Sequence, residues 1–272
     1  MDNYIKNYDT YQATIVYQHE RHDGGVGDYM RFFMNALYLS MQFGYRMTCM
    51  KNENGIQKYI RMKYPQMYIT KEEIGDTWSY GLNNIERLYE IKSVSQLTPT
   101  HHIIGPGFFY NPNIHYPITQ PYRDVFFFSD DVIQNSAVLL PDVVQPYISI
   151  HLRLGDRYLE TDQEYVVSKL DSRSYNEQRL FECIEEHADQ TILFFCDNHS
   201  YKQKIKEKYS HVIITTCPIG HTSLSNTTPT QILDGITELY IMTNSTKIYS
   251  ASWSGFSHVA AKYHNIPLIK LY

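Results

Sequence analysis

The sequence predicts an α/β protein whose second half forms a parallel, doubly wound sheet. One observation is a strand, a glycine-rich turn and a helix near the N-terminus, and a second is the regular alternation of strands and helices after residue 147. A third is length, because 272 residues exceed the usual size of one domain. We therefore expect two domains, with residues 1–135 in the first and 136–272 in the second.

The first half opens with its clearest elements. Residues 13–17 are a β-branched run typical of a strand, and the glycine-rich turn His22–Asp28 follows. From Met30 to Met41, apolar residues recur at helical spacing, and Gly44 is suited to end that helix. Two further short helices are expected at residues 55–64 and 84–92, among loops rich in proline and glycine.

The second half alternates more regularly between strand and helix patterns. Strands are expected at residues 147–152, 191–195, 211–215, 247–250 and 266–269. Helices are expected at residues 174–187, 200–208, 228–242 and 254–264. Thr228 and Pro229 are typical of a helix start. Strands separated by helices pair in parallel, which predicts one continuous sheet here.

Composition excludes several functional classes. The net charge of −5 does not favour a nucleic-acid surface, since the phosphate backbone requires clustered positive charge. No run of about 18 apolar residues occurs, so no membrane span is expected. The N-terminus has no apolar segment like that of a secretory signal, and the four cysteines lack metal-binding spacing. We expect reduced thiols and a cytoplasmic location.

Polar residues gather after four of the expected strands. They are Gly24–Asp28, Arg153–Asp156, Asp197 with Asn198, and Ser252–Ser257. In a parallel α/β sheet, ligands bind beyond the carboxyl ends of the strands. The four clusters together therefore predict one ligand site.

The most informative cluster is His151-Leu-Arg-Leu-Gly-Asp156. Alternation along the strand places His151 and Arg153 on one face. The planar guanidinium of Arg153 matches phosphate oxygens, and Asp156 is placed to hold it or a sugar hydroxyl. The alternative is an ordinary surface pair between Arg153 and Asp156, which would contribute little.

The other clusters also permit two interpretations. The turn at Gly24–Asp28 is either a tight strand-to-helix connection or a loop whose amides approach a diphosphate. It is not a P-loop, because it lacks the Gly-Lys-Ser/Thr ending, and it is not a dinucleotide fingerprint, because Met30 occupies the third glycine position. The segment Ser252–Ser257 enters a helix, where Ser254 caps the helix, binds an anion, or does both.

In their order, these clusters resemble the superfamily of alpha-1,2-, alpha-1,6- and protein O-fucosyltransferases. The matching features are the Gly25–Asp28 turn, the His-x-Arg-x-Gly-Asp motif at 151–156, a strand that ends at Asp197, Asp234 on a helix, and the serine-rich turn Ser252–Ser257. The match runs from about residue 14 to 265, but residues 50–140 match no pattern of the family. Leu154 stands where the alpha-1,2 enzymes carry a second arginine, so the linkage is left open.

The resemblance implies a GT-B-like fold of two Rossmann-like domains that face a central cleft. The N-terminal domain would bind a carbohydrate acceptor, and the C-terminal domain a GDP-sugar donor. Arg153 would contact the β-phosphate, and His151 and Asp197 would lie around the ribose and guanine. The residues expected to complete the donor site are Gly25, Gly27, Asp156, Asp234, Ser252, Ser254, Gly255, Phe256 and Ser257.

The implied reaction is an inverting, metal-independent transfer of fucose from GDP-fucose to a glycan hydroxyl, with no cofactor. Fixed donors such as Arg153 can stabilise the leaving diphosphate without a metal. His22, Asp23 and Asp28 are the candidates for the base. One alternative is a GT-B enzyme for another nucleotide sugar, and another is a non-catalytic nucleotide- or glycan-binding protein. A metal-dependent GT-A enzyme is a further rival, but the sequence has no Asp-x-Asp motif.

Overall fold

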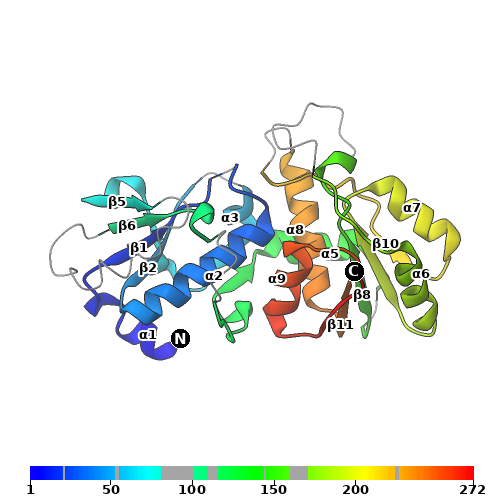
Figure 1. Ribbon diagram of the computed structural model, residues 1–272, viewed down its shortest axis with the longest axis horizontal. Coiled ribbons are helices and arrows are strands. Elements are labelled where there is room, and N and C mark those ends of the chain that lie inside the picture. Colours follow the sequence, from blue (N-terminus) through cyan, green and yellow to red (C-terminus); the bar gives the residue numbers. More distant parts are fainter. Residues whose placement is uncertain are drawn as a thin grey trace.

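The computed structural model describes residues 1–20, 22–52, 55–80, 101–109, 116–143, 145–159, 171–223 and 227–272. Two five-stranded parallel sheets and one antiparallel strand pair organise this part of the chain. The two sheets lie apart, with the helices α2, α5, α8 and α9 between or across them (Figure 1).

The first sheet has the strand order β4-β2-β1-β6-β5. Its strands are β1 (Thr14–Tyr17), β2 (Arg46–Met50), β4 (Tyr68–Ile69), β5 (Thr77–Tyr80) and β6 (His101–Ile104), and all neighbouring pairs are parallel. The helix α2 (Val26–Phe43) packs on β1 and β2. It ends at Gly44, which adopts the left-handed conformation as its spacing predicts. A short helix, α1 (Asp2–Lys6), precedes this sheet.

The second sheet has the order β10-β9-β8-β11-β12, again with all pairs parallel. Its strands are β8 (Ile148–Leu152), β9 (Ile192–Cys196), β10 (Ile213–Ile214), β11 (Lys247–Ser250) and β12 (Leu268–Lys270). The connecting helices are α6 (Glu177–Glu186), α7 (His199–Lys208), α8 (Pro229–Thr243) and α9 (Gly255–His264). Every strand and helix predicted for the second half is present within a few residues.

Helices α6, α7 and α8 begin at residues suited to cap them. The side chains of Asn176 and Asn198 accept hydrogen bonds from the backbone N–H groups of Arg179 and Tyr201 at the starts of α6 and α7. At the start of α8, Thr228 and Gln231 form a reciprocal capping box. These side chains satisfy amide groups that a helix leaves without internal partners.

The region between the sheets differs from the sequence prediction. The helix expected at 55–64 ends early, as α3 (Gly55–Tyr59), and the strand β3 (Ile60–Met62) follows. The reason is that burial alternates here with the two-residue period of a strand, since Ile60 and Met62 are buried while Arg61 is exposed. This strand pairs with β7 (Phe126–Phe128). The helix expected at 84–92 lies outside the described residues.

The helix α5 (Asp130–Leu139) joins the two halves and packs along α8. The Nδ2 atom of Asn135 donates to Asp234 Oδ1 at 2.9 Å and to Thr237 Oγ1 at 3.0 Å. The predicted division at residues 135 and 136 therefore falls inside a helix that is attached to the second half. The assignment of domains stays a prediction.

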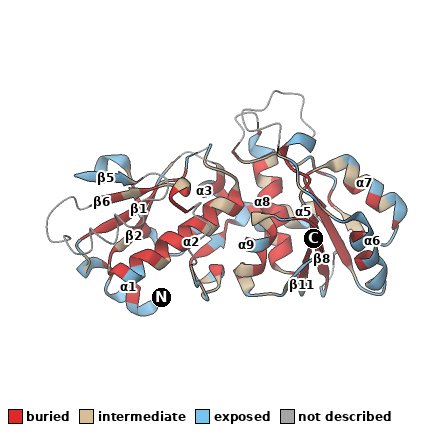
Figure 2. Cartoon of the chain, viewed as in Figure 1, coloured by how far each residue is buried: buried red, intermediate tan, exposed pale blue. Residues whose placement is uncertain are grey.

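One hydrophobic core continues from the first sheet into the second. It includes residues of α2 and β1 together with α8 and α9, and it covers one face of the second sheet through Leu193 and Phe195. A separate core on the opposite face contains Ile192 and Phe194 under α6 and α7. Figure 2 shows that the strands of this sheet are buried along most of their length. Successive strand residues point to opposite faces, so β9 contributes to both cores.

In the described part of the chain, no helix is long and apolar enough to cross a lipid bilayer.

Candidate functional site

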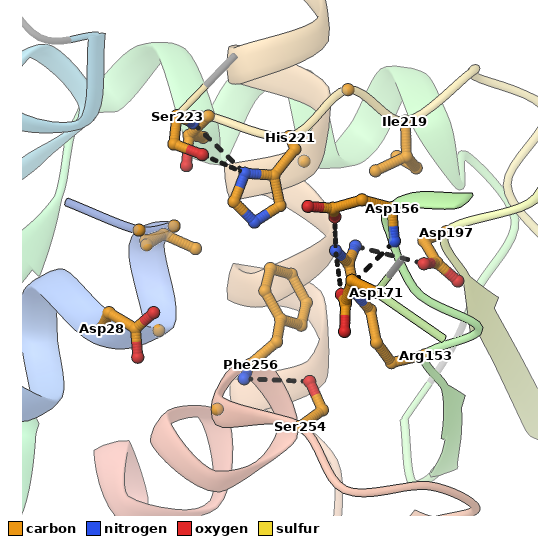
Figure 3. Close-up of a pocket in the computed structure, with 18 of the residues that line it drawn as sticks. Asp28, Arg153, Asp156, Asp171, Asp197, Ile219, His221, Ser223, Ser254 and Phe256 are labelled. Carbon is orange, nitrogen blue, oxygen red and sulfur yellow. Dashed lines mark hydrogen bonds and ion pairs between the residues drawn. The ribbon is translucent and has the colours of Figure 1, made fainter. Parts of the chain in front are cut away.

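A cavity of about 360 Å³ lies where the turns after β1, β8, β9 and β11 converge. Its volume is within the range typical of small-molecule sites. The strands β8 and β11 are adjacent in the second sheet, but the chain leaves β8 toward β9 on the other side. Such a reversal of strand order is where open α/β sheets bind ligands. Figure 3 shows Arg153 on one side of the cavity and Asp28 on the other.

Arg153 follows β8 and enters the cavity as an ion-paired group. Its Nη1 atom lies 3.1 Å from Asp197 Oδ2, and its Nη2 atom contacts Asp156 and lies 3.8 Å from Asp171 Oδ2. Because these carboxylates occupy only part of the guanidinium, donors remain for a phosphate. The side chain thus has a fixed direction before any ligand binds.

The backbone around Arg153 is held by two buried side chains. Ser252 accepts a hydrogen bond from the Arg153 N–H at 2.8 Å and donates to the Arg153 carbonyl at 2.7 Å. The oxygens of Asp197 accept from the backbone N–H groups of Leu154 at 2.7 Å and Gly155 at 2.9 Å. Both residues were predicted as donor-site residues. In the structure, their hydrogen bonds fix the turn that carries Arg153.

The turn also depends on Gly155, whose φ of +109° is unfavourable for other residues. A side chain there would meet the backbone of Asp171 and Ser172. The next residue, Asp156, is buried, and its burial raises the pKa of its carboxyl although Arg153 acts in the opposite direction. The predicted motif is therefore a compact turn that places Arg153 and Asp156 at the cavity.

The N-termini of two helices meet at the cavity. Gly25 precedes α2, and Ser254 precedes α9, where its Oγ atom accepts from the Phe256 N–H at 3.2 Å. A Cβ atom on Gly27 would lie 2.7 Å from the carbonyl carbon of Gly255. The two helices can therefore approach this closely only without a side chain at position 27. Their free N–H groups and aligned dipoles favour an anion between them.

Asp28 lies in the first turn of α2 and lines the cavity. Its Oδ1 atom accepts from Arg31 Nη2 at 2.7 Å. Burial raises the pKa of Asp28, and Arg31 offsets this only partly. Of the other base candidates, His22 lines the cavity and is exposed, whereas Asp23 accepts from the Glu20 N–H at 2.7 Å and lies outside the lining.

His151 stacks on Phe256, with ring centroids 5.4 Å apart and an angle of 28° between the planes. Burial, together with the charge of Arg153, lowers the pKa of His151 to about 3. Its Nδ1 atom is buried and has no hydrogen-bond partner in the described part of the chain. Because His151 lines the cavity and this ring nitrogen is without a partner there, its neutral imidazole is suited to bind a polar ligand.

Three predicted donor residues do not line the cavity. Ser252 holds the Arg153 backbone, as described above. Asp234 on α8 accepts from Asn135 of α5. Ser257 in α9 pairs with Ser250, with 2.9 Å between the two Oγ atoms. In the structure, all three support the walls rather than form the surface of the cavity.

The sequence analysis missed several residues that line the cavity. They are Arg31, Asp171, Arg173, Ile219–Ser223, Gly235 and Glu238. Glu238 lies one helical turn after Asp234, but the sequence does not indicate which of these two carboxylates faces the cavity. The loop at 219–223 had none. It includes His221, whose Nδ1 atom lies 2.5 Å from Ser223 Oγ and whose pKa burial lowers to about 3.

Within the described ranges, no group of three or more histidine, cysteine, aspartate or glutamate side chains is placed to hold a metal ion.

Comparison with known proteins identifies the fold. No protein-family model matches the sequence, and no curated protein sequence does either. Among solved structures, the chain is similar to a mutant of FUT1 from Arabidopsis thaliana in complex with GDP, with 10% identity, a TM-score of 0.63, and coverage of 100% of this chain and 74% of that one.

Two other solved structures are similar over nearly their whole length. POFUT1 in complex with GDP has 10% identity and a TM-score of 0.53, with 96% of this chain and 99% of that chain covered. NodZ alpha-1,6-fucosyltransferase soaked with GDP-fucose has 10% identity and a TM-score of 0.54, with 92% of each chain covered. The protein therefore has the GT-B-like fold of the fucosyltransferases, with two parallel α/β halves facing a central cleft, as the sequence resemblance implied.

Proposed function

We propose that this protein is an inverting glycosyltransferase that transfers fucose from GDP-fucose to a hydroxyl group of a glycan. The observation that carries the proposal is the cavity in which Arg153 faces the N-termini of α2 and α9. This arrangement suits a diphosphate, and the similar structures named above hold GDP or GDP-fucose.

In the proposed complex, Arg153 and the helix N-termini bind the diphosphate. As the bond between the sugar and the β-phosphate breaks, the electron pair moves onto the phosphate oxygens. The guanidinium and the fixed N–H groups stabilise this charge as it forms. The reaction is proposed to proceed without a metal, with the remaining guanidinium donors of Arg153 and the helix N–H groups hydrogen-bonded to the leaving diphosphate.

Glu238 is proposed to bind the nucleobase. Its carboxylate lies on α8, lines the cavity and is only 3% exposed. A carboxylate is an acceptor only, so it matches the N1–H and amino donors of guanine. His151 and Phe256 form an adjacent stacked pair that offers an aromatic face and the Nδ1 atom to the nucleoside. The selection of guanine would then rest on α8 rather than on Asp197, whose oxygens hold backbone amides.

Asp28 is the proposed base. It is the only carboxylate among the three candidates that lines the cavity, and it lies opposite Arg153 (Figure 3). Its raised pKa brings it closer to the range useful for accepting a proton near neutral pH. The acceptor oxygen attacks the anomeric carbon from the face opposite the diphosphate while Asp28 takes its proton. One bond forms as the other breaks, so the configuration inverts.

A thermal-shift panel tests the donor site. GDP, GDP-fucose, UDP and CMP are added without metal to the wild type and to Arg153→Ala. We expect stabilisation by the two guanine ligands alone and a weaker shift in the variant. A response to UDP alone would favour another nucleotide sugar and overturn the proposal.

Turnover of GDP-fucose with a panel of glycan acceptors then distinguishes an enzyme from a binding protein. We expect release of GDP that depends on an acceptor and on Asp28. Binding of GDP-fucose without any release of GDP would support a non-catalytic protein instead.

A further inference from the structure

Lys202 is a buried cation beside the cavity. It lies on α7 and has 0% exposed surface, which is rare for lysine unless its charge is paired. Its Nζ atom donates to Thr215 Oγ1 at 2.8 Å, to Glu238 Oε1 at 3.0 Å and to the carbonyl of Cys217 at 3.4 Å. All three donors of the ammonium group are therefore used, and Lys202 itself is not part of the cavity lining.

The same network holds one oxygen of Glu238. The Oε1 atom accepts from Lys202 and from the Thr215 hydroxyl, and the Cys217 Sγ atom lies 3.8 Å from it. Within the described residues, none of these bonds involves Oε2. Because Glu238 lines the cavity, Oε2 is the oxygen left for a ligand. The protein thus holds the Oε1 atom of the carboxylate and leaves its Oε2 atom for a ligand.

Stability alone does not account for this pair. A buried ion pair loses about as much in desolvation as it gains in attraction, so apolar replacement is often neutral or stabilising. Here both partners are buried, with 0% of Lys202 and 3% of Glu238 exposed. A fixed negative charge at the cavity wall, in contrast, has a use when the ligand presents hydrogen-bond donors.

We propose that Lys202 is a positioning residue for base selection, which fixes the carboxylate of Glu238 and directs its Oε2 atom toward the nucleobase. This inference rests on the proposed function. Guanine presents two adjacent donors to such an oxygen. Hypoxanthine presents one, and adenine presents an acceptor at the equivalent ring nitrogen. A rigid carboxylate rejects adenine more strongly than a mobile one, since it cannot turn away from the acceptor.

The test compares the affinities of GDP, IDP and ADP for the full chain by calorimetry. The variants are Lys202→Met, Glu238→Gln and the double variant. The matched control is Lys206→Met on the same helix, which removes a lysine that donates to the carbonyl of Val212 at 2.8 Å and does not line the cavity. We expect Lys202→Met to reduce the preference for GDP over ADP at least tenfold, while Lys206→Met leaves it unchanged.

The double variant shows whether Lys202 acts through Glu238. If it does, Lys202→Met causes no further loss of preference once Glu238→Gln is present. Should Lys202→Met not fold, Lys202→Gln takes its place, because its carboxamide supplies N–H donors without the charge. Equal weakening of GDP and ADP by the Lys202 variant would indicate a purely structural role and overturn the inference. A wild type with no preference for guanine would instead refute the proposed function.

Discussion

Replacing Gly27 by alanine tests the contact between the two helix N-termini. The new Cβ atom would lie 2.7 Å from the carbonyl carbon of Gly255, 2.9 Å from the Phe256 nitrogen and 3.0 Å from the Gly255 oxygen. All three are backbone atoms, so no side chain can rotate to make room. Either α2 or α9 must move, and the cavity between them changes shape.

The expected magnitude follows from two opposing effects. Overpacking a tight contact costs about 1–3 kcal/mol. Alanine favours a helix over glycine by up to about 1 kcal/mol, although less in the first turn. The net loss is about 1–2 kcal/mol, which corresponds to a Tm lower by roughly 2–8 °C in a chain of this size. GDP binding should weaken as well, because the helix N-termini no longer face the diphosphate together.

Gly235→Ala is the matched control for stability. Gly235 lies inside α8, and a Cβ atom there would meet no heavy atom within 4 Å. The remaining effect is the preference of a helix for alanine over glycine, so this variant should be more stable by about 0.5–1 kcal/mol. The stability of both variants is measured by urea unfolding, and calorimetry measures GDP binding by Gly27→Ala and the wild type, since Gly235 itself lines the cavity. A Gly27→Ala protein that is as stable as the wild type and binds GDP equally well would refute the close contact.

Three further predictions concern the charged residues of the cavity. Asp28→Asn should slow transfer by about 100- to 10,000-fold with little change in GDP affinity, whereas Asp23→Asn should remain near the wild type; equal losses in a turnover assay would exclude Asp28 as the base. Arg153→Ala should slow transfer by about ten- to several-hundred-fold and lower the Tm, because its carboxylate partners lose their counter-charge. His151, whose pKa falls from 6.5 to about 3 on folding, should make the protein lose stability as the pH drops below 6.5. His151 alone should contribute up to about 1.4 kcal/mol per pH unit to this loss, because only the unfolded chain takes up its proton, and His221, whose pKa is lowered in the same way, adds its own share. His151→Asn should reduce this loss in urea unfolding at pH 7, 6 and 5, and an unchanged loss would assign it to other groups.

The second half of the fold was predictable because its signals are local. Buried strands such as residues 192–196 carry continuous apolar runs, and caps such as Thr228 mark helix starts by residue type alone. The segment at 60–62 was not predictable in this way. Its identity as a strand depends on pairing with β7, more than 60 residues away in sequence. A helical pattern can fit so short a run equally well.

The candidate site was predictable where it follows strand ends, and not where it depends on tertiary position. The motif at 151–156 and the turn at 252–257 follow β8 and β11, whose pairing brings them together. In contrast, Glu238 and Asp234 are both acidic and lie on the same helix. Only the packing of α5 against α8 decides that Asp234 faces Asn135 while Glu238 faces the cavity.

The core that continues from α2 through α8 and α9 has a consequence for engineering. A chimera that exchanges the first 135 residues for those of a relative would divide α5 and expose apolar surface on α8. An exchange intended to alter acceptor choice should therefore keep residues 122–139 with the second half, since α9 packs on residues 122–124 and α8 on α5. Grafts limited to surface loops of the first sheet leave this helix packing unchanged and keep unfolding cooperative.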